Sequence, residues 1–434
     1  MPKILLVTVG GSPQPILTAI EALQPDRVIF ICSDGSKGSK TQIIGNGKPC
    51  EIRRGEEVKK LPNIPTHLGL NNFQPDTDLV LIQNSDDLSE CYCLISNTIR
   101  TLQQGFPNYQ ILVDYTGGTK TMSAALAMAG IDYDLNLHIT TSTTRENLFR
   151  VERGETTERV STIAIAVERK IEQFLPLLLQ QYNYAGAIAE LRNLLQLELP
   201  NETKQRIRIL RDCCAGFDAW DRFAHTDAWY LLQSYMKKLE IQPGALFLKR
   251  VMNSRTAIDE KFKALDGIKG HGYEVVQDLL LNAERRAAQE RYDDAVGRLY
   301  RAIELLAQIR LWQAHEIKTG DVDLQKIPES LRDELLLHSD RDKIQLALTQ
   351  SYLLLGKLTK EPLGKTYQER AAKIQNVLQI RNYSILAHGF QPITKTEYQK
   401  FSGVVVSFIQ DSIAMLVPEK QQFQPVQFPQ ELIF

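Results

Sequence analysis

The spacing of apolar residues changes once along the chain, near residues 155–165, and this change limits the possible folds more than any other feature. Before it, short runs rich in β-branched residues alternate with segments of helical periodicity. After it, nearly every segment as far as residue 416 has helical periodicity alone. Alternating strands and helices are typical of a parallel sheet covered on both faces. We therefore predict an α/β domain followed by an all-α region.

Five strands are predicted in the first part, with helical segments between them. The strands are KILLVTVG (3–10), RVIFICS (27–33), TDLVLIQ (77–83), YQILVDYT (109–116) and LNLHITTST (135–143). LFRVERG (148–154) is a candidate edge strand. The segment 34–66, rich in Gly, Lys, Asn and Pro, is predicted to be a long irregular excursion with one short helix, and long loops of this kind often carry function in α/β folds.

Composition excludes several classes of protein. The 434 residues include 51 Lys and Arg against 52 Asp and Glu, and neither half resembles a polybasic nucleic-acid-binding arm. The six cysteines form no CxxC pair or other metal-ligand spacing, so we expect reduced thiols. No stretch approaches 18 apolar residues, and the N-terminus lacks the pattern of a signal peptide. We expect a cytoplasmic protein with no membrane partner.

Two glycine-containing loops follow predicted strands, TVGGSPQP (8–15) and DYTGGTKTM (114–122). Ligands of open parallel sheets bind beyond the carboxyl ends of the strands. In the second loop a helix opens at Thr119 and Lys120, where free N–H groups and a lysine favour an anion. The spacings GxGxxG and GxxxxGK[ST] are both absent, which favours a phosphodiester ligand over a dinucleotide or NTP. Taken alone, the glycines are equally compatible with a tight turn and a solvated Lys120.

A second candidate site is the stretch RNYSILAHGF, residues 381–390. If it is helical, Arg381 and His388 share a face about 10 Å apart along the axis, with Ser384 between them. Gly389 and Pro392 are then expected to end the helix. A guanidinium can stabilise charge on a phosphate and an imidazole can transfer a proton. RNA supplies its own 2′-OH nucleophile, so no metal is required. On spacing alone, a pair of ordinary surface side chains is the favoured interpretation.

The motif DYTGGTKTM, together with the glycine-containing loop TVGGSPQP, resembles the CARF domain of CRISPR-associated proteins. The resemblance covers most of residues 1–155. That family is a Rossmann-like homodimer that binds cyclic oligoadenylate. The resemblance implies the following ligand-binding residues: Gly10, Gly11, Ser12, Thr116, Gly117, Gly118, Thr119 and Lys120. Asn84 and Ser85, after the third predicted strand, are weaker candidates. Some CARF domains cleave their ligand slowly, and Lys120 is then the residue to suspect.

The motif RNxxxxxHG resembles the R-x(4–6)-H motif of HEPN ribonucleases, whose helical domains dimerise to build one active site from two subunits. The resemblance implies catalytic roles for Arg381, Asn382, Ser384 and His388. The stretch 291–311 looks like an earlier helix of that domain. Its polar residues Arg301 and Glu304 either brace the site or form an exposed salt-bridged face, and the second interpretation is favoured.

The order of the two motifs resembles the CARF–HEPN ribonucleases of type III CRISPR systems. The expected architecture is a CARF-like domain (1–160), a helical linker domain (161–280) and a HEPN-like domain (281–434). The resemblance implies a homodimeric endoribonuclease of antiviral defence that cleaves single-stranded RNA without a metal cofactor. Its expected activator is cyclic oligoadenylate, with cyclic tetra-adenylate preferred. The alternatives are a non-enzymatic sensor whose helical half binds a protein or DNA, and a Rossmann-like nucleotide-binding enzyme with a helical lid.

Overall fold

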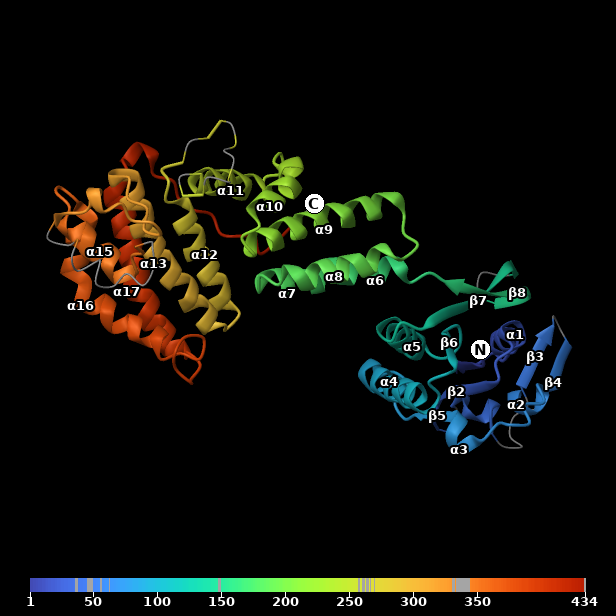
Figure 1. Ribbon diagram of the computed structural model, residues 1–434. Coiled ribbons are helices and arrows are strands. Elements are labelled where there is room, and N and C mark those ends of the chain that lie inside the picture. The colour runs from blue at the N-terminus through green and yellow to red at the C-terminus, as the bar shows by residue number, and fades with distance from the viewer. Residues whose placement is uncertain are drawn as a thin grey trace. The chain divides into compact units, whose positions relative to one another are not determined.

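The chain folds into two compact units, Met1–Ala166 and Val167–Phe434, which are drawn in Figure 1. The computed structural model describes residues 1–35, 38–44, 50–54, 57–61, 63–146, 150–256, 270–329 and 344–432, with residues 258, 259, 262, 265, 267, 268 and 332. The last strand ends at Val160 and the next helix begins at Ile163. Among the described residues, none of the helices combines the length and the apolar character needed to cross a membrane.

The N-terminal unit is built on a six-stranded sheet of order β5-β2-β1-β6-β7-β8. The first five of these strands run parallel, and β8 pairs antiparallel with β7 at one edge. The strands of this sheet are β1 (Lys3–Thr8), β2 (Arg27–Ser33), β5 (Leu79–Ile82), β6 (Gln110–Asp114), β7 (Asn136–Glu146) and β8 (Arg150–Val160). The helices of this unit are α1 (Gln14–Leu23), α2 (Ile64–His67), α3 (Pro75–Asp78), α4 (Leu88–Gly105) and α5 (Lys120–Asp132).

Alternation along β1 places its apolar side chains on both faces of the sheet. Ile4 and Leu6 are fully buried with residues of α4 and α5, whereas Leu5 and Val7 are buried with residues of α1. Figure 1 shows α4 and α5 on one side of the strands and α1 on the other. The near-continuous apolar run of KILLVT thus reflects a central strand that is covered on both faces.

All five predicted strands of the first part are confirmed, and the α/β fold class with them. The edge strand predicted at 148–154 is also present as β8, although residues 148 and 149 lie outside the described residues. The irregular excursion predicted at 34–66 is wrong in one respect: it contains a hairpin of β3 (Cys50–Arg54) and β4 (Glu57–Leu61). Both strands are short and largely charged, so no apolar run marked them in the sequence.

The second unit is helical, as predicted. Its helices are α6 (Ile163–Arg169), α7 (Leu175–Gln180), α8 (Tyr184–Leu195), α9 (Asn201–Asp221), α10 (His225–Leu232), α11 (Gln242–Arg255), α12 (Glu274–Ala288), α13 (Tyr292–His315), α15 (Leu348–Lys357), α16 (Pro362–Asn382) and α17 (Lys395–Leu416). The long helix α13 packs against α12, α15, α16 and α17, and α8 packs against α9. The predicted helix at 291–311 is α13.

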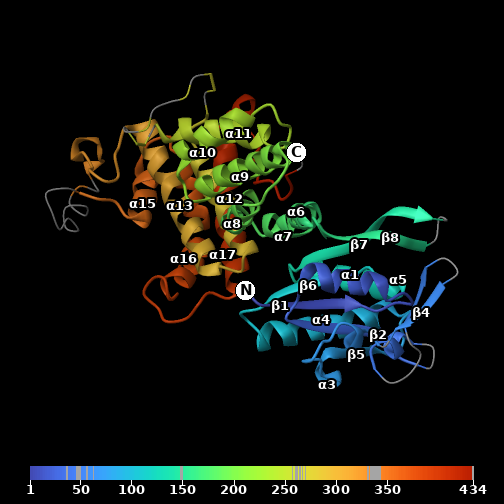
Figure 2. The same ribbon diagram turned by 90° about the vertical axis from the view of Figure 1, so that its right-hand side faces the viewer.

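An extended segment follows α17, and we call residues 418–430 the C-terminal strap. In Figures 1 and 2 it runs in red from α17 to α9. Phe428 is only 4% exposed, with ring centroids 4.8 Å from Trp220 and 5.1 Å from Phe217. The hydroxyl of Tyr184 donates to the carbonyl of Pro429 at 2.7 Å. The end of the strap therefore completes a buried core of the helical unit.

Candidate functional site

The two predicted loops of the N-terminal unit meet at the carboxyl edge of the sheet. Strands β1 and β6 are parallel neighbours, so the loops that follow them leave the sheet side by side. A Cβ atom on Gly10 would lie 2.7 Å from the amide nitrogen of Gly118, and one on Gly117 would overlap the carbonyl oxygen of Thr8. Gly118 has a φ of +85°, which side chains rarely tolerate. These glycines allow a contact between backbones that no other residue type permits.

Hydroxyl groups tie the second loop in place. Thr8 and Ser123 both donate to the carbonyl of Gly117, at 2.7 and 2.6 Å. Thr119 caps α5 by accepting from the N–H of Met122, and its hydroxyl donates to the carbonyl of Ser85 at 2.8 Å. The Thr119 hydroxyl is thus engaged within the protein, where its primary role is to fix the loop.

Thr116 is likewise engaged within the protein. Its hydroxyl accepts from the N–H of Thr140 at 2.7 Å, while its own N–H donates to buried Asp114 at 3.0 Å. Thr140 adds a second hydrogen bond to Asp114 at 3.1 Å. Burial raises the pKa of Asp114, and these hydrogen bonds oppose the shift only in part. This network joins β6 to β7 directly beneath the loop.

Lys120, Ser12, Gly11 and Asn84 are exposed around the same edge. Lys120 is the first residue of α5, and its amino group has no hydrogen bond or ion pair with any described residue. The side chain of Asn84 accepts only from the N–H of Asp86, at 3.3 Å, among the contacts of the described residues. The edge therefore offers a helix N-terminus and an uncompensated ammonium group, which together favour an anionic ligand.

Sequence reasoning missed two residues that shape this edge. Gln42 donates from its side chain to the carbonyl of Gly10 at 2.6 Å and so supports the first loop. Asp34, directly after β2, accepts from Lys40 and from the side chain of Gln83, the latter at 3.0 Å. The Lys40 hydrogen bond is the main reason that the pKa of Asp34 is lowered. The same strand-end rule that indicated the glycine loops would have found Asp34 and Gln83.

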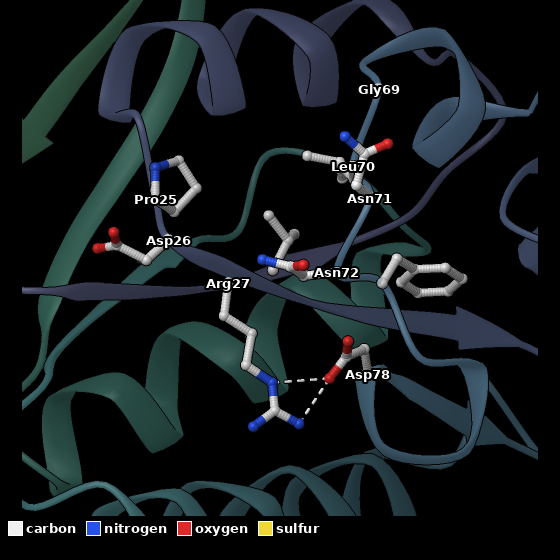
Figure 3. A pocket seen from close by; sticks show the side chains of 10 residues that line it. Pro25, Asp26, Arg27, Gly69, Leu70, Asn71, Asn72 and Asp78 are labelled. Atoms are coloured by element: carbon white, nitrogen blue, oxygen red, sulfur yellow. Dashed lines mark hydrogen bonds and ion pairs between the residues drawn. The ribbon is translucent and has the colours of Figure 1, made fainter.

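A cavity of about 240 Å³ lies at the opposite edge of the sheet, beside the start of β2, and is drawn in Figure 3. Its one arginine, Arg27, pairs with Asp78 at 2.6 Å and stacks over the ring of Phe106, 4.9 Å from its centroid. Because Asp78 already neutralises the charge of Arg27, this cavity is a weaker candidate for an anionic ligand than the carboxyl edge of the sheet.

The second predicted site lies at the end of α16. The prediction that RNYSILAHGF is helical is wrong. The helix ends at Asn382, so Arg381 is in its last turn while Ser384 and His388 belong to a loop. They do not share a helical face. The reason lies at Gly389, where a Cβ atom would overlap the carbonyl oxygen of Tyr383. The chain turns back on itself here more tightly than a helix would.

Backbone hydrogen bonds close this loop, which we call the motif loop (residues 383–392). The N–H of His388 donates to the carbonyl of Asn382 at 3.2 Å, and that of Gly389 donates to Ser384 at 3.0 Å. The loop thus returns the backbone of His388 to Asn382 at the end of α16, by a route other than the predicted one. Ser384 is only 4% exposed and lies on the inner side of the loop.

Arg381 is half-buried, and its guanidinium is held by a ring instead of a carboxylate. Its central carbon lies 4.6 Å from the ring centroid of Tyr300 on α13, and one N–H donates to the side chain of Asn382 at 3.3 Å. No acidic side chain pairs with it among the described residues. Arg301, which we had considered as a brace, instead pairs with Glu304 at 2.6 Å on an exposed face, in agreement with our favoured interpretation.

His388 is exposed, and so are four large apolar side chains near it in the motif loop. They are Tyr383 (72% exposed), Ile385 (51%), Leu386 (66%) and Phe390 (87%). Sequence reasoning also missed Asp293 on α13, whose carboxylate accepts from the N–H of Ile393 at 2.9 Å and anchors the far end of the motif loop. No local pattern indicated Tyr300 or Asp293, because their contacts with Arg381 and Ile393 join residues far apart in the sequence.

Comparison with known proteins agrees with this arrangement. Residues 265–412 match the family model of the Csm6 HEPN domain. No curated protein matches the chain. Among solved structures, Enterococcus italicus Csm6 bound to cyclic hexa-2′-fluoro-hexa-dAMP matches at 12% identity with a TM-score of 0.53, over 97% of this chain and 96% of that one.

A second solved structure is Can2 from Sulfobacillus thermosulfidooxidans in complex with cyclic tetra-adenylate. It aligns at 12% identity over 96% of this chain and 100% of that one, but its TM-score of 0.21 is too low to indicate a shared overall fold. The similarity to Csm6 extends over both units, and the matched domain contains Arg381 and His388. Residues 265–412 thus match a Csm6-type HEPN domain, and the chain as a whole shares its fold with Csm6.

Proposed function

We propose that this protein is a cyclic-oligoadenylate-activated endoribonuclease of CRISPR antiviral defence, which acts on single-stranded RNA in the cytoplasm. The observation that carries the proposal is the Csm6-type HEPN match over residues 265–412, which contains RNxxxxxHG. The N-terminal unit adds a glycine-built anion site at the carboxyl edge of its sheet. We assign this unit to residues 1–160, a helical linker to 161–280 and the HEPN domain to 281–434.

The proposed reaction needs only what Arg381 and His388 provide. The 2′-oxygen of RNA attacks the adjacent phosphorus as its proton leaves, and the bond to the 5′-oxygen breaks as that oxygen receives a proton. The products are a 2′,3′-cyclic phosphate and a 5′-hydroxyl. Imidazole groups transfer these protons, and the unpaired guanidinium stabilises the charge on the phosphate oxygens. Asn382 orients Arg381 through their hydrogen bond, and Ser384 holds the loop that carries His388. Such a reaction requires no metal.

The active site is proposed to be shared between two copies of the chain. Four large apolar side chains are exposed on the motif loop around His388. Exposed apolar clusters of this kind mark interaction sites, and a second motif loop would both cover them and bring a second Arg–His pair to the same groove. The functional unit is therefore proposed to be a homodimer.

The activator is proposed to bind at the carboxyl edge of the sheet, with Lys120 and the start of α5 facing its phosphates. Gly10, Gly117 and Gly118 shape the floor, and Gly11, Ser12 and Asn84 lie exposed beside it. Thr116 and Thr119 act through the loop that they fix. Cyclic tetra-adenylate is the expected ring. Slow cleavage of that ring would involve Lys120.

One assay tests these assignments together. A labelled single-stranded RNA is incubated in EDTA with and without cyclic tetra- or hexa-adenylate, using wild type, His388→Ala and Lys120→Ala. We expect ligand-dependent, EDTA-resistant cleavage that His388→Ala abolishes, and a higher activator requirement for Lys120→Ala. Matched controls are His67→Ala, at an exposed histidine, and Lys395→Ala, at the exposed first residue of α17. Ligand binding without any cleavage would support the non-enzymatic sensor instead.

A further inference from the structure

The guanidinium of Arg381 rests on an aromatic ring that belongs to a different helix. We propose that Tyr300 is the positioning residue that aims Arg381 at the scissile phosphate. This inference rests on the proposed ribonuclease function, and it adds a residue that lies outside the RNxxxxxHG motif. It is carried by the 4.6 Å distance between the guanidinium carbon of Arg381 and the ring centroid of Tyr300.

A ring holds an arginine differently from a carboxylate. The face of a guanidinium stacks on an aromatic ring, whereas its N–H donors point outward from its edge. A carboxylate partner would occupy two of those donors and cancel the charge. Arg381 has no such partner in the described part of the chain, and its one N–H contact is the neutral amide of Asn382. It is therefore oriented and still fully charged, as phosphate recognition requires.

The part of α13 that carries Tyr300 is firmly packed. Its neighbours Leu299 and Ile303 on α13 are at most 1% exposed, and the carbonyl of Ile303 accepts from the buried hydroxyl of Tyr352 on α15 at 2.8 Å. The next residue, Arg301, is turned toward Glu304 and Gln308, so its charge is satisfied along its own helix. α13 thus presents one ring to Arg381 from a helix packed on several sides.

The same helix also anchors the far end of the motif loop, through the hydrogen bond from the N–H of Ile393 to Asp293. Arg381 and the residue that follows the motif loop, Ile393, therefore both contact side chains of α13. A shift of Arg381 relative to His388 would separate the phosphate-binding group from the proton-transfer group. Small misplacements of this kind lower rates strongly.

The test uses the full chain, saturating cyclic tetra-adenylate and a labelled single-stranded RNA. Tyr300→Phe keeps the ring, and we expect kcat/KM near the wild-type value. Tyr300→Leu removes the ring face, and we expect kcat/KM to fall about tenfold, as the loss of a partly desolvated cation–π contact would give. Tyr292→Leu is the matched control, because Tyr292 is a half-buried tyrosine of the same helix that packs against Tyr398 instead.

A double-mutant cycle separates positioning from a purely structural role. In the non-cleaving His388→Ala background, RNA affinity is measured for Tyr300→Leu, Arg381→Ala and both together. If Tyr300 acts through Arg381, the double variant binds no more weakly than Arg381→Ala alone. Additive losses, an unchanged rate for Tyr300→Leu, or an equal loss for Tyr292→Leu would overturn the inference.

The result is distinguishable from failure of the proposed function. Absence of ligand-dependent cleavage by the wild type would overturn both proposals at once, before any variant is compared. Thermal unfolding of each variant checks that it is folded. If Tyr300→Leu is unfolded, Tyr300→Met takes its place in every arm, because it keeps a long apolar side chain without a ring.

Discussion

Single glycines determine where both candidate sites can form. Gly10 and Gly117 let two loops of the sheet touch, and Gly389 lets the motif loop turn back against Tyr383. The residue types of both sites were predictable from the sequence, because the patterns DYTGGTKTM and RNxxxxxHG are local. The groups that orient them were not. Tyr300 contacts Arg381 across 81 residues of sequence, a separation over which no spacing rule operates.

Replacing Gly389 by alanine should disrupt the motif loop without unfolding the helices around it. The added Cβ atom would overlap the carbonyl of Tyr383, so His388 must move away from Arg381. We expect RNA cleavage to fall about 100-fold, as for a misplaced catalytic group.

Gly403→Ala is the matched control for this change. Gly403 lies exposed on α17 with no atom near an added Cβ, so the change should stabilise the helix by about 1 kcal/mol at most and leave cleavage unchanged. Cleavage rates and thermal unfolding measure both effects. Equal cleavage by the two variants would contradict the proposed role of the loop turn.

Asp114 makes the stability of the N-terminal unit depend on pH. Burial raises its pKa in the folded protein, so the folded state favours the protonated carboxyl. Its contribution to stability is therefore full below the pKa of the unfolded chain, and it is lost as the pH rises through the raised pKa.

Asp114→Asn removes this ionisation and keeps an oxygen that can accept from Thr116. We expect the unfolding temperature of the wild type, relative to this variant, to fall as the pH rises from about 4 through the raised pKa, because the unfolded carboxyl titrates near 3.9. Thermal denaturation at a series of pH values measures the difference. A difference that is constant across that range would show that the buried carboxyl does not control it.

At the scale of elements, the sequence predicted the sheet well and the helix ends poorly. Buried parallel strands are near-continuous apolar runs, and all five were found at nearly their observed bounds. The end of α16 was placed several residues too late, because RNYSILAHGF has helical periodicity. The close approach of Gly389 to the backbone of Tyr383 is a turn that periodicity does not record. The hairpin of β3 and β4 was missed for lack of apolar residues.

The C-terminal strap is the element whose importance the sequence understated most. Phe428 fills a space between Tyr184, Phe217 and Trp220, and the guanidinium of Arg285 lies 3.6 Å from its ring centroid. Phe428→Ala should therefore lower the free energy of unfolding of the helical unit by about 3 kcal/mol, as for other buried Phe→Ala changes.

An exposed aromatic residue provides the comparison. Tyr230 on α10 is 74% exposed, and Tyr230→Ala should change the free energy of unfolding by less than about 0.5 kcal/mol. Urea denaturation followed by circular dichroism measures both variants. If Phe428→Ala is no more destabilising than Tyr230→Ala, the strap is not part of the core.

At the scale of the whole molecule, ligand recognition and RNA cleavage are proposed for separate units, each with its own buried apolar residues. Regulation then requires allosteric coupling: ligand binding to one unit must change the free-energy difference between the inactive and active states of the other. The order of the two units was predictable, because the change of periodicity near residues 155–165 is a property of long stretches. The coupling between them was not, because no local pattern of residues records it.

Calorimetry can assign the ligand to one unit. Cyclic tetra-adenylate at about 100 times its dissociation constant should stabilise the unit that binds it by about 2.7 kcal/mol. We expect this increase in the unfolding transition of the sheet unit, and we expect Lys120→Ala to reduce it. An increase confined to the helical transition would place the ligand elsewhere. Each unfolding transition is assigned to its unit with two variants. Asp114→Asn changes the sheet unit, and Phe428→Ala changes the helical unit.

The strap has a consequence for how the protein is made. Because Phe428 completes a core that begins at α8, the helical unit cannot finish folding until residue 428 has emerged from the ribosome. The sheet unit contains all of its own strands by Val160 and can fold long before, in the usual N-terminal-first order. During synthesis, the sheet unit can thus be folded before the helical unit, which contains Arg381 and His388, has completed its core. The part of the chain for which RNA cleavage is proposed therefore matures last.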